Sequence, residues 1–232
     1  TELIDNGYLK TPLLIEAFQK IDRRDFVPEE EISHAYANDP LPIGHGQTIS
    51  QPLTVAFMLE LLQPKPKDRI FDVGSGSGWQ TALLAYVVSK DEEKKLSSRF
   101  DIAANLPKNL RLSSLGLGEV SAMERIPELR DMAEKIIEKY HFISRGVARV
   151  LLGDASRGVP DELFLSEGFD KIIAAARAEE IPVTWKKQLK VGGRIVAPVQ
   201  GSIVVLEKHG ADNFHKEEFP GFRFVPLVVG EE

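Results

Sequence analysis

A glycine-rich turn between a buried strand and a helix constrains the fold of this 232-residue chain more than any other feature. Residues 69–73, Arg-Ile-Phe-Asp-Val, are typical of a buried strand, and residues 80–88 are typical of a helix. The connection reads Asp72-Val73-Gly74-Ser75-Gly76-Ser77-Gly78-Trp79. Glycine permits a tight turn and a close approach to the backbone, and a helix N-terminus offers free N–H groups. The turn therefore predicts a nucleotide-type binding site.

The glycine spacing separates two kinds of site. A dinucleotide fingerprint would require a glycine at position 79, where the chain has Trp79. The pattern D-x-G-x-G-x-G, which begins at Asp72, instead resembles the first motif of Rossmann-like methyltransferases, whose loop holds the amino-acid part of S-adenosylmethionine. A turn with only structural duties is the alternative.

The order of apolar segments predicts an α/β fold with a doubly wound, mostly parallel sheet and helices on both faces. Helical patterns over residues 126–140 and 181–189 separate strand-like runs. These runs are residues 119–123, 147–151, 171–175 and 194–198. Two further runs, 203–208 and 223–229, have no helix-length segment between them and predict an antiparallel C-terminal edge.

Composition and length favour one domain over residues 1–232. The N-terminal part, residues 1–66, contains predicted helices at 11–20 and 52–62, separated by a loop rich in proline and glycine. Residues 90–118 open with a charge run and lack the apolar period of a core element, so we interpret them as an insertion. No apolar run is long enough to cross a bilayer, and the start of the chain has no secretory signal pattern, so we expect a cytoplasmic protein.

Two acids that follow predicted strands are candidates for cofactor contacts. Glu124 lies 46 residues beyond Gly78, whereas the ribose-binding acid typically lies about 20 residues beyond the loop. Removal of the insertion brings Glu124 into range. Asp154 follows the third strand, where it could meet an adenine amino group or simply cap the next helix.

A longer stretch carries a more specific resemblance. Residues 35–52 read AYANDPLPIGHGQTISQP and are very similar to the signature loop of the protein-L-isoaspartate O-methyltransferase family. The similarity continues through residues 123–129, 174–176, 181–182 and 223–227. Many members have Asp where this chain has Asn38, and Pro at or near the position of Ala178.

The resemblance implies methyl transfer from S-adenosylmethionine, with S-adenosylhomocysteine as product, to the free α-carboxylate of L-isoaspartyl residues in damaged proteins. It implies a substrate loop within residues 1–66, with Ser50 as the residue that holds the carboxylate; a Ser50 that merely caps the helix at Pro52 is the alternative. The cofactor residues it implies are Gln47, Thr48, Asp72, Gly74, Ser75, Gly76, Gly78, Glu124, Arg125, Asp154 and Ala155. The substrate residues are Ile49, Ser50, Ala175, Val225 and Pro226.

The chemistry of this reaction fits the composition. A carboxylate is already an anion at neutral pH, so no general base such as His45 is needed. With no cysteine in the chain there is no thiol nucleophile, and we expect no metal. The net charge of −6 argues against nucleic acid as a partner.

Damaged proteins and peptides are thus the expected partners, and we expect no membrane association. We also expect a monomer, with the insertion as the place where subunits could associate. Two other functions remain open at this point. One is methyl transfer to another carboxylate or small molecule, and the other is cofactor binding without catalysis.

Overall fold

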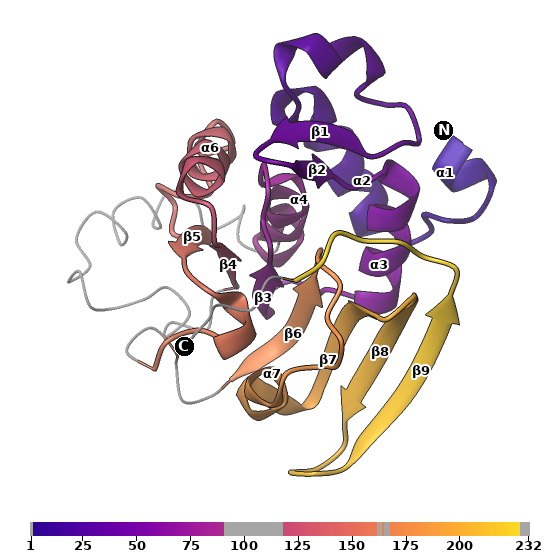
Figure 1. Cartoon of the computed structure of the whole chain (residues 1–232), viewed down its shortest axis with the longest axis vertical. Coiled ribbons are helices and arrows are strands. Elements are labelled where there is room, and N and C mark those ends of the chain that lie inside the picture. The colour runs from indigo at the N-terminus through magenta and orange to yellow at the C-terminus, as the bar shows by residue number, and fades with distance from the viewer. Residues whose placement is uncertain (1, 91–117, 162–163, 165–167, 228–232) are drawn as a thin grey trace.

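A seven-stranded sheet forms the centre of the computed structural model, which describes residues 2–90, 118–161, 164 and 168–227 (Figure 1). The strands lie in the order β5-β4-β3-β6-β7-β8-β9. Their bounds are β3 (Arg69–Val73), β4 (Glu119–Glu124), β5 (Ala148–Leu152), β6 (Phe169–Ala174), β7 (Leu189–Val199), β8 (Ser202–Lys208) and β9 (Phe214–Pro220). The neighbours in the series β5-β4-β3-β6-β7 pair in parallel. Strand β8 pairs antiparallel with β7, and β9 pairs antiparallel with β8. The predicted fold class, including the antiparallel C-terminal edge, is confirmed.

The strand order reverses direction at β3. After β3 the chain builds β4 and β5 on one side, and it then returns to place β6 on the other side of β3. The carboxyl ends of β3 and β6 therefore lie next to each other, with Val73 opposite Ala174. In open α/β sheets, ligands bind outside the carboxyl ends of the strands at such a switch point.

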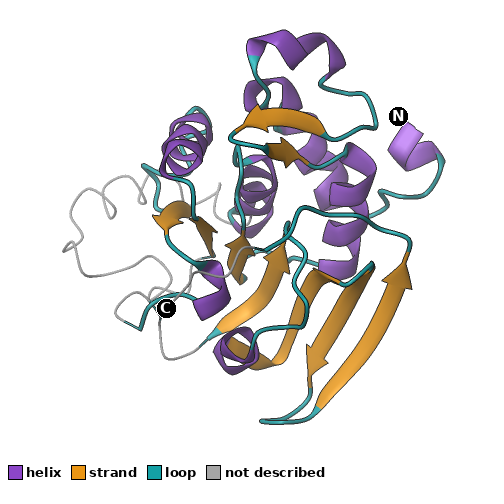
Figure 2. Ribbon diagram, in the orientation of Figure 1, coloured by secondary structure: helices purple, strands orange, loops and turns teal. Residues whose placement is uncertain are grey.

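Helices cover both faces of the sheet (Figure 2). One face is packed by α2 (Pro12–Lys20), α3 (Pro52–Leu62), α4 (Trp79–Val88) and α6 (Pro127–Glu138). The other face is packed by α7 (Val183–Gln188) and the short helix η5 (Ala155–Arg157). Alternate strand residues supply the two faces: Ile70 and Ile173 face the first set of helices, while Phe71 and Ile172 face the second.

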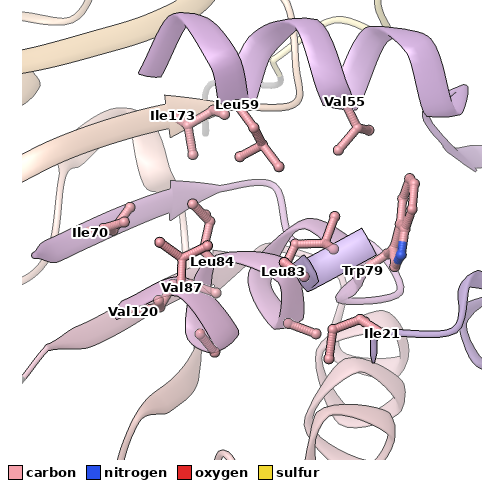
Figure 3. Packing of buried hydrophobic residues seen from close by; sticks show 14 of the residues in the cluster. Ile21, Val55, Leu59, Ile70, Trp79, Leu83, Leu84, Val87, Val120 and Ile173 are labelled. Carbon is pink, nitrogen blue, oxygen red and sulfur yellow. The ribbon is translucent and has the colours of Figure 1, made fainter. Parts of the chain in front are cut away.

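Helix α4, which follows the glycine-rich turn, is enclosed by other elements. Its apolar side chains meet the sheet on one side, and Figure 3 shows Val55 and Leu59 of α3 facing Leu83, with Trp79 at the end of this layer. Nine of the ten α4 residues are buried. The turn is thus joined to an element that can hardly shift without disturbing the core.

The segment that we expected to be an extended loop, residues 23–51, contains regular structure. It forms η1 (Arg23–Phe26), η2 (Glu29–His34) and a hairpin of β1 (Leu41–Gly44) and β2 (Gln47–Ile49), and a short helix α1 (Glu2–Asp5) precedes α2. The prolines and glycines lie between these elements rather than replacing them. Pro28 precedes η2, while Gly44 and Gly46 adopt positive φ angles at the hairpin turn.

The prediction of a strand at 223–229 is wrong for residues 223–227, which form only an isolated bridge between Pro226 and Arg177. Within the described part of the chain, the last strand is instead β9, which we did not predict. Most of its side chains are exposed, and its centre reads His-Lys-Glu-Glu. Charged side chains are typical of an edge strand that must avoid pairing with another chain, and they remove the apolar alternation by which a strand is recognised.

The inserted segment 90–118 lies, except for its first and last residue, outside the described residues, so its docking remains a prediction. Within the part of the chain that the structure describes, no helix is both long enough and apolar enough to cross a membrane.

Candidate active site

The glycine-rich turn lies at the switch point between β3 and α4. Gly74, Gly76 and Gly78 all adopt positive φ angles, of 78°, 54° and 96°. At Gly78 the space is also restricted, because a Cβ there would lie 2.9 Å from Cδ1 of Ile137 in α6. Only glycine satisfies both conditions without a shift of α6.

Asp72 holds the turn from below. It is fully buried, and its carboxylate accepts hydrogen bonds from Gln80 Nε2 at 2.7 Å and from Thr81 Oγ1 at 2.6 Å. Burial raises the pKa of Asp72 to about 6, because desolvation disfavours the charged form more than these two hydrogen bonds favour it. Asp72 therefore fixes the first turn of α4 relative to β3.

Glu124, at the carboxyl end of β4, joins the glycine turn to the start of the next loop. Its Oε2 accepts a hydrogen bond of 3.0 Å from the Gly76 N–H. Its Oε1 accepts bonds from the N–H groups of Arg125 and Ile126, at 2.9 and 3.0 Å. A carboxylate has about four acceptor positions, so three N–H donors leave Glu124 with capacity for one further donor.

A cavity opens above these residues, along the carboxyl ends of the strands. Its walls come from the β2 strand, the glycine turn, the loops after β4, β5 and β6, and the C-terminal segment. The lining residues are Gln47, Thr48, Gly74, Gly76, Met123, Glu124, Arg125, Ile126, Gly153, Asp154, Ala155, Ala175, Ala176, Val225, Pro226 and Leu227. A Cβ on Gly74 would lie 4.0 Å from Cβ of Ala176, which also lines the cavity, so a side chain at position 74 would take up part of this space.

A second, smaller cavity adjoins the first and shares Thr48, Gly74, Gly76 and Ala175 with it. Ile49 and Ser50 line it on one side. On the other side lie Ser75, Ser77 and Trp79. The hydroxyls of both serines and the Trp79 indole N–H are buried and have no hydrogen-bond partner among the described residues. Three orphaned polar atoms around one small cavity are typical of a site that binds a polar ligand.

The structure brings most of the predicted site residues together in these two cavities. Asp72 and Gly78 line neither cavity. Asp72 bonds the first turn of α4, and Gly78 packs against α6. Asp154 lines the larger cavity. It also caps the short helix η5, because its side chain accepts a hydrogen bond of 2.9 Å from the Ser156 N–H. The cavities are also lined by residues that we did not predict, among them Met123, Ile126, Gly153, Ala176, Leu227, Ser77 and Trp79. Most of them directly adjoin predicted residues, which is the signal that could have found them.

Ser50 does not cap α3. The residue at the cap position is Gln51, which makes no capping bond through its side chain. The N–H of Leu53 in the first turn is instead bonded at 3.1 Å by Oδ1 of Asn38, which lies 15 residues earlier. Asn38 thus has a defined structural task that an amide oxygen performs as well as a carboxylate.

Arg23 holds the backbone of the Ser50 loop. Its Nε donates to the carbonyl oxygen of Ala35 at 2.6 Å, its Nη1 donates to that of Ser50 at 2.8 Å, and its guanidinium lies 4.4 Å from the centre of the Trp79 ring. Burial lowers the pKa of Arg23 to about 10, which still leaves the group charged at neutral pH. Among the described residues, no group of three or more His, Cys, Asp or Glu side chains could hold a metal ion.

Comparison with solved structures supports the fold. A structure reported as a protein-L-isoaspartate O-methyltransferase of Plasmodium falciparum, in complex with S-adenosyl-L-homocysteine, superposes with a TM-score of 0.77. The match covers 98% of this chain and 95% of that one, at 23% identity. The sheet order, the glycine turn and the cavity at the switch point define a Rossmann-like fold with a ligand site at the carboxyl ends of its strands.

Sequence comparison identifies the family. Residues 1–232 match the family described as protein-L-isoaspartate(D-aspartate) O-methyltransferase, and the chain belongs to it. A protein-L-isoaspartate O-methyltransferase of Methanopyrus kandleri is 36% identical over 97% of this chain and 87% of its own length. One of Aeropyrum pernix is 35% identical over 98% of this chain and 76% of its own length.

Proposed function

We propose that this enzyme transfers the methyl group of S-adenosylmethionine to the α-carboxylate of L-isoaspartyl residues in damaged proteins, through the residues of the two joined cavities. The observation that supports this assignment most strongly is that the two cavities adjoin each other. The larger cavity contains the glycine turn and the two strand-end acids, and it continues into a smaller one bordered by Ser50.

The residues of the larger cavity suit the cofactor. The glycine turn, with Gln47 and Thr48, would hold the amino-acid part, and the orphaned Ser75 hydroxyl is available to it where the smaller cavity adjoins the larger one. The remaining acceptor capacity of Glu124 suits a ribose hydroxyl, while Arg125, Asp154 and Ala155 would border the adenine. When bound, S-adenosylmethionine supplies a methyl group on a sulfonium, which needs no metal or general base from the protein.

The smaller cavity suits the substrate carboxylate. The Ser50 hydroxyl would donate a hydrogen bond to it, and Ile49, Ala175, Val225 and Pro226 would border the backbone on either side. An isoaspartyl α-carboxylate, with an unperturbed pKa near ~3.5, is an anion at neutral pH. The enzyme then has two tasks, which are to orient oxygen and methyl carbon and to exclude water. The apolar borders and the single directed hydroxyl are suited to both.

We propose that the protein acts as a monomer in the cytoplasm on proteins and peptides, without nucleic acid as a partner. The absence of cysteine is consistent with a chain that needs no oxidative folding, and the net charge of −6 disfavours phosphate backbones.

The test is to incubate a peptide that has a single isoaspartyl residue with S-adenosylmethionine and to locate the ester by mass spectrometry. Methylation of the α-carboxylate at that residue is expected. Methylation elsewhere in the peptide, or activity only toward small carboxylic acids, would contradict the assignment.

A further inference from the structure

Two arginines of this chain, Arg177 and Arg223, lie at an open hollow beside the candidate active site. The hollow has a volume of about 530 Å³ and is lined by Arg177, Gln200, Gly201, Gly221, Phe222, Arg223 and Phe224. Both arginines are exposed. No acidic residue is among these lining residues.

The absence of a carboxylate matters because this protein is acidic overall, with a net charge of −6. Five other described arginines form ion pairs with acidic side chains, as Arg24 does with Asp22 and Arg194 with Glu207. Among the described residues neither Arg177 nor Arg223 forms an ion pair. The lining of the hollow therefore has two positive side chains and no negative one.

Two segments of the chain connect the lining of the hollow with the walls of the active site. Arg177 follows Ala176, and Arg223 comes two residues before Val225, both of which line the larger cavity. The two segments are bonded side by side: the Arg177 N–H donates to the Val225 carbonyl at 2.8 Å, and the Leu227 N–H donates to the Arg177 carbonyl at 2.7 Å.

The floor of the hollow is fixed to the rest of the fold. The Phe222 ring stacks on Phe57 of α3, with 5.2 Å between the ring centres. The N–H groups of Gly221 and Phe222 both donate to the carbonyl oxygen of Gly201, in the turn between β7 and β8. The arginines thus project from a backbone that is held in place before any substrate binds.

A peptide whose isoaspartyl residue lies at Ser50, Ala175 and Val225 must extend away from that point in both directions. Arg177 is two residues from Ala175 and Arg223 is two residues from Val225, so each lies within roughly 7 Å of that residue along the backbone, the span of two extended residues. The second or third neighbour of the isoaspartyl residue can therefore reach the hollow. We infer that Arg177 and Arg223 select among peptide substrates by binding an acidic side chain that flanks the isoaspartyl residue. This inference rests on the proposed placement of the substrate.

The experiment compares isoaspartyl peptides that differ only in one flanking residue, Glu or Gln, placed in turn at each of the three positions on either side. For at least one position, we expect the KM of the Glu peptide to be lower by roughly 1.4- to five-fold per arginine, the range for exposed ion pairs. This preference should shrink as salt is added, because exposed charges are screened.

The double variant Arg177→Gln/Arg223→Gln should lose the preference and keep its kcat on the Gln peptide. Lys135→Gln, which removes an exposed charge from α6, should change neither quantity, and Arg177→Lys should keep the preference even if the Gln variants fold poorly. Equal KM values for Glu and Gln peptides at every position would overturn the inference. So would a preference that survives in the double variant, or a loss of turnover on both peptides. A complete lack of isoaspartyl methylation by the unaltered enzyme would instead contradict the proposed function.

Discussion

Arg23 donates a hydrogen bond of 2.8 Å from its Nη1 to the carbonyl oxygen of Ser50, although 27 residues separate the two. The same guanidinium bonds the carbonyl of Ala35 and lies over Trp79. A buried cation held by backbone carbonyls, rather than by a carboxylate, is costly to desolvate. Its contacts indicate that it sets the position of the Ser50 loop.

We therefore expect Arg23→Lys, which keeps the charge but cannot make both bonds, to lower kcat for peptide methylation by about ten-fold or more. Loss of one bond to a buried carbonyl costs about 1–3 kcal/mol. The measurement is kcat and KM well below the melting temperature, beside cofactor affinity, which should change little. The neighbouring exposed Arg24, changed to Gln, is the matched control. A lower melting temperature with an unchanged kcat would show that Arg23 serves stability alone.

Ser50→Ala tests the contact with the substrate carboxylate. Removal of a hydrogen bond to a charged group costs roughly 1.5 to 3 kcal/mol, which corresponds to a loss of about 10- to 150-fold in kcat/KM. Cofactor affinity should stay close to that of the unaltered enzyme. Because Asn38 and not Ser50 caps α3, the variant should also keep its thermal stability. Unchanged turnover would remove Ser50 from the reaction.

Glu124→Ala tests the junction between the glycine turn and the cofactor. The change leaves the N–H groups of Gly76, Arg125 and Ile126 without their acceptor and removes the proposed acceptor for ribose. We expect the Kd for S-adenosylmethionine, measured by calorimetry, to rise by at least about ten-fold. Glu128→Ala, an exposed acid in the first turn of α6, is the control and should leave the Kd unchanged. Equal affinities of both variants for S-adenosylmethionine would show that Glu124 binds backbone N–H groups without contributing to cofactor binding.

Asp72 gives the protein a predictable pH dependence. Its folded-state pKa of about 6 lies above the value of about 3.9 expected in the unfolded chain, so the folded state binds the proton more tightly. The stabilisation from this group is complete below about pH 3.9 and is lost as the pH rises through 6. The rise in the pKa from about 3.9 to about 6 corresponds to roughly 3 kcal/mol.

Asp72→Asn cannot titrate. Urea unfolding at several pH values between 4 and 7 should therefore show that the stability of the unaltered protein, relative to the variant, falls by up to about 3 kcal/mol as the pH rises. Parallel curves would show that Asp72 titrates normally.

The parts of this fold that were predictable from sequence are those with a local cause. The strand at residues 69–73 and the helices beginning at Pro12 and Pro52 have apolar periods and proline starts, and the glycine turn has its own spacing. Contacts between distant segments were not predictable. Nothing in the sequence around Asn38 indicates that it will cap α3, and nothing around Arg23 indicates that it will hold the Ser50 carbonyl, because both contacts depend on how the hairpin packs against α3.

In the candidate site too, features with a local cause were predictable and contacts between distant segments were not. The acids at strand ends were predictable because parallel strands present their carboxyl ends at one edge of the sheet. The indirect position of Asp72 was not, since burial beneath the turn depends on the packing of α4. The strand β9 escaped prediction because its exposed charged residues carry no apolar period.

The central claim is that this enzyme recognises the α-carboxylate of an isoaspartyl residue. The most direct measurement is the initial rate of labelled methyl transfer from S-adenosylmethionine to an isoaspartyl peptide and to its normal aspartyl twin. The carboxylate lies at a different distance from the backbone in the two peptides, so only the first should place its oxygen against the methyl group. We predict methylation of the isoaspartyl peptide and no transfer above background to the twin; equal rates on both would contradict the account.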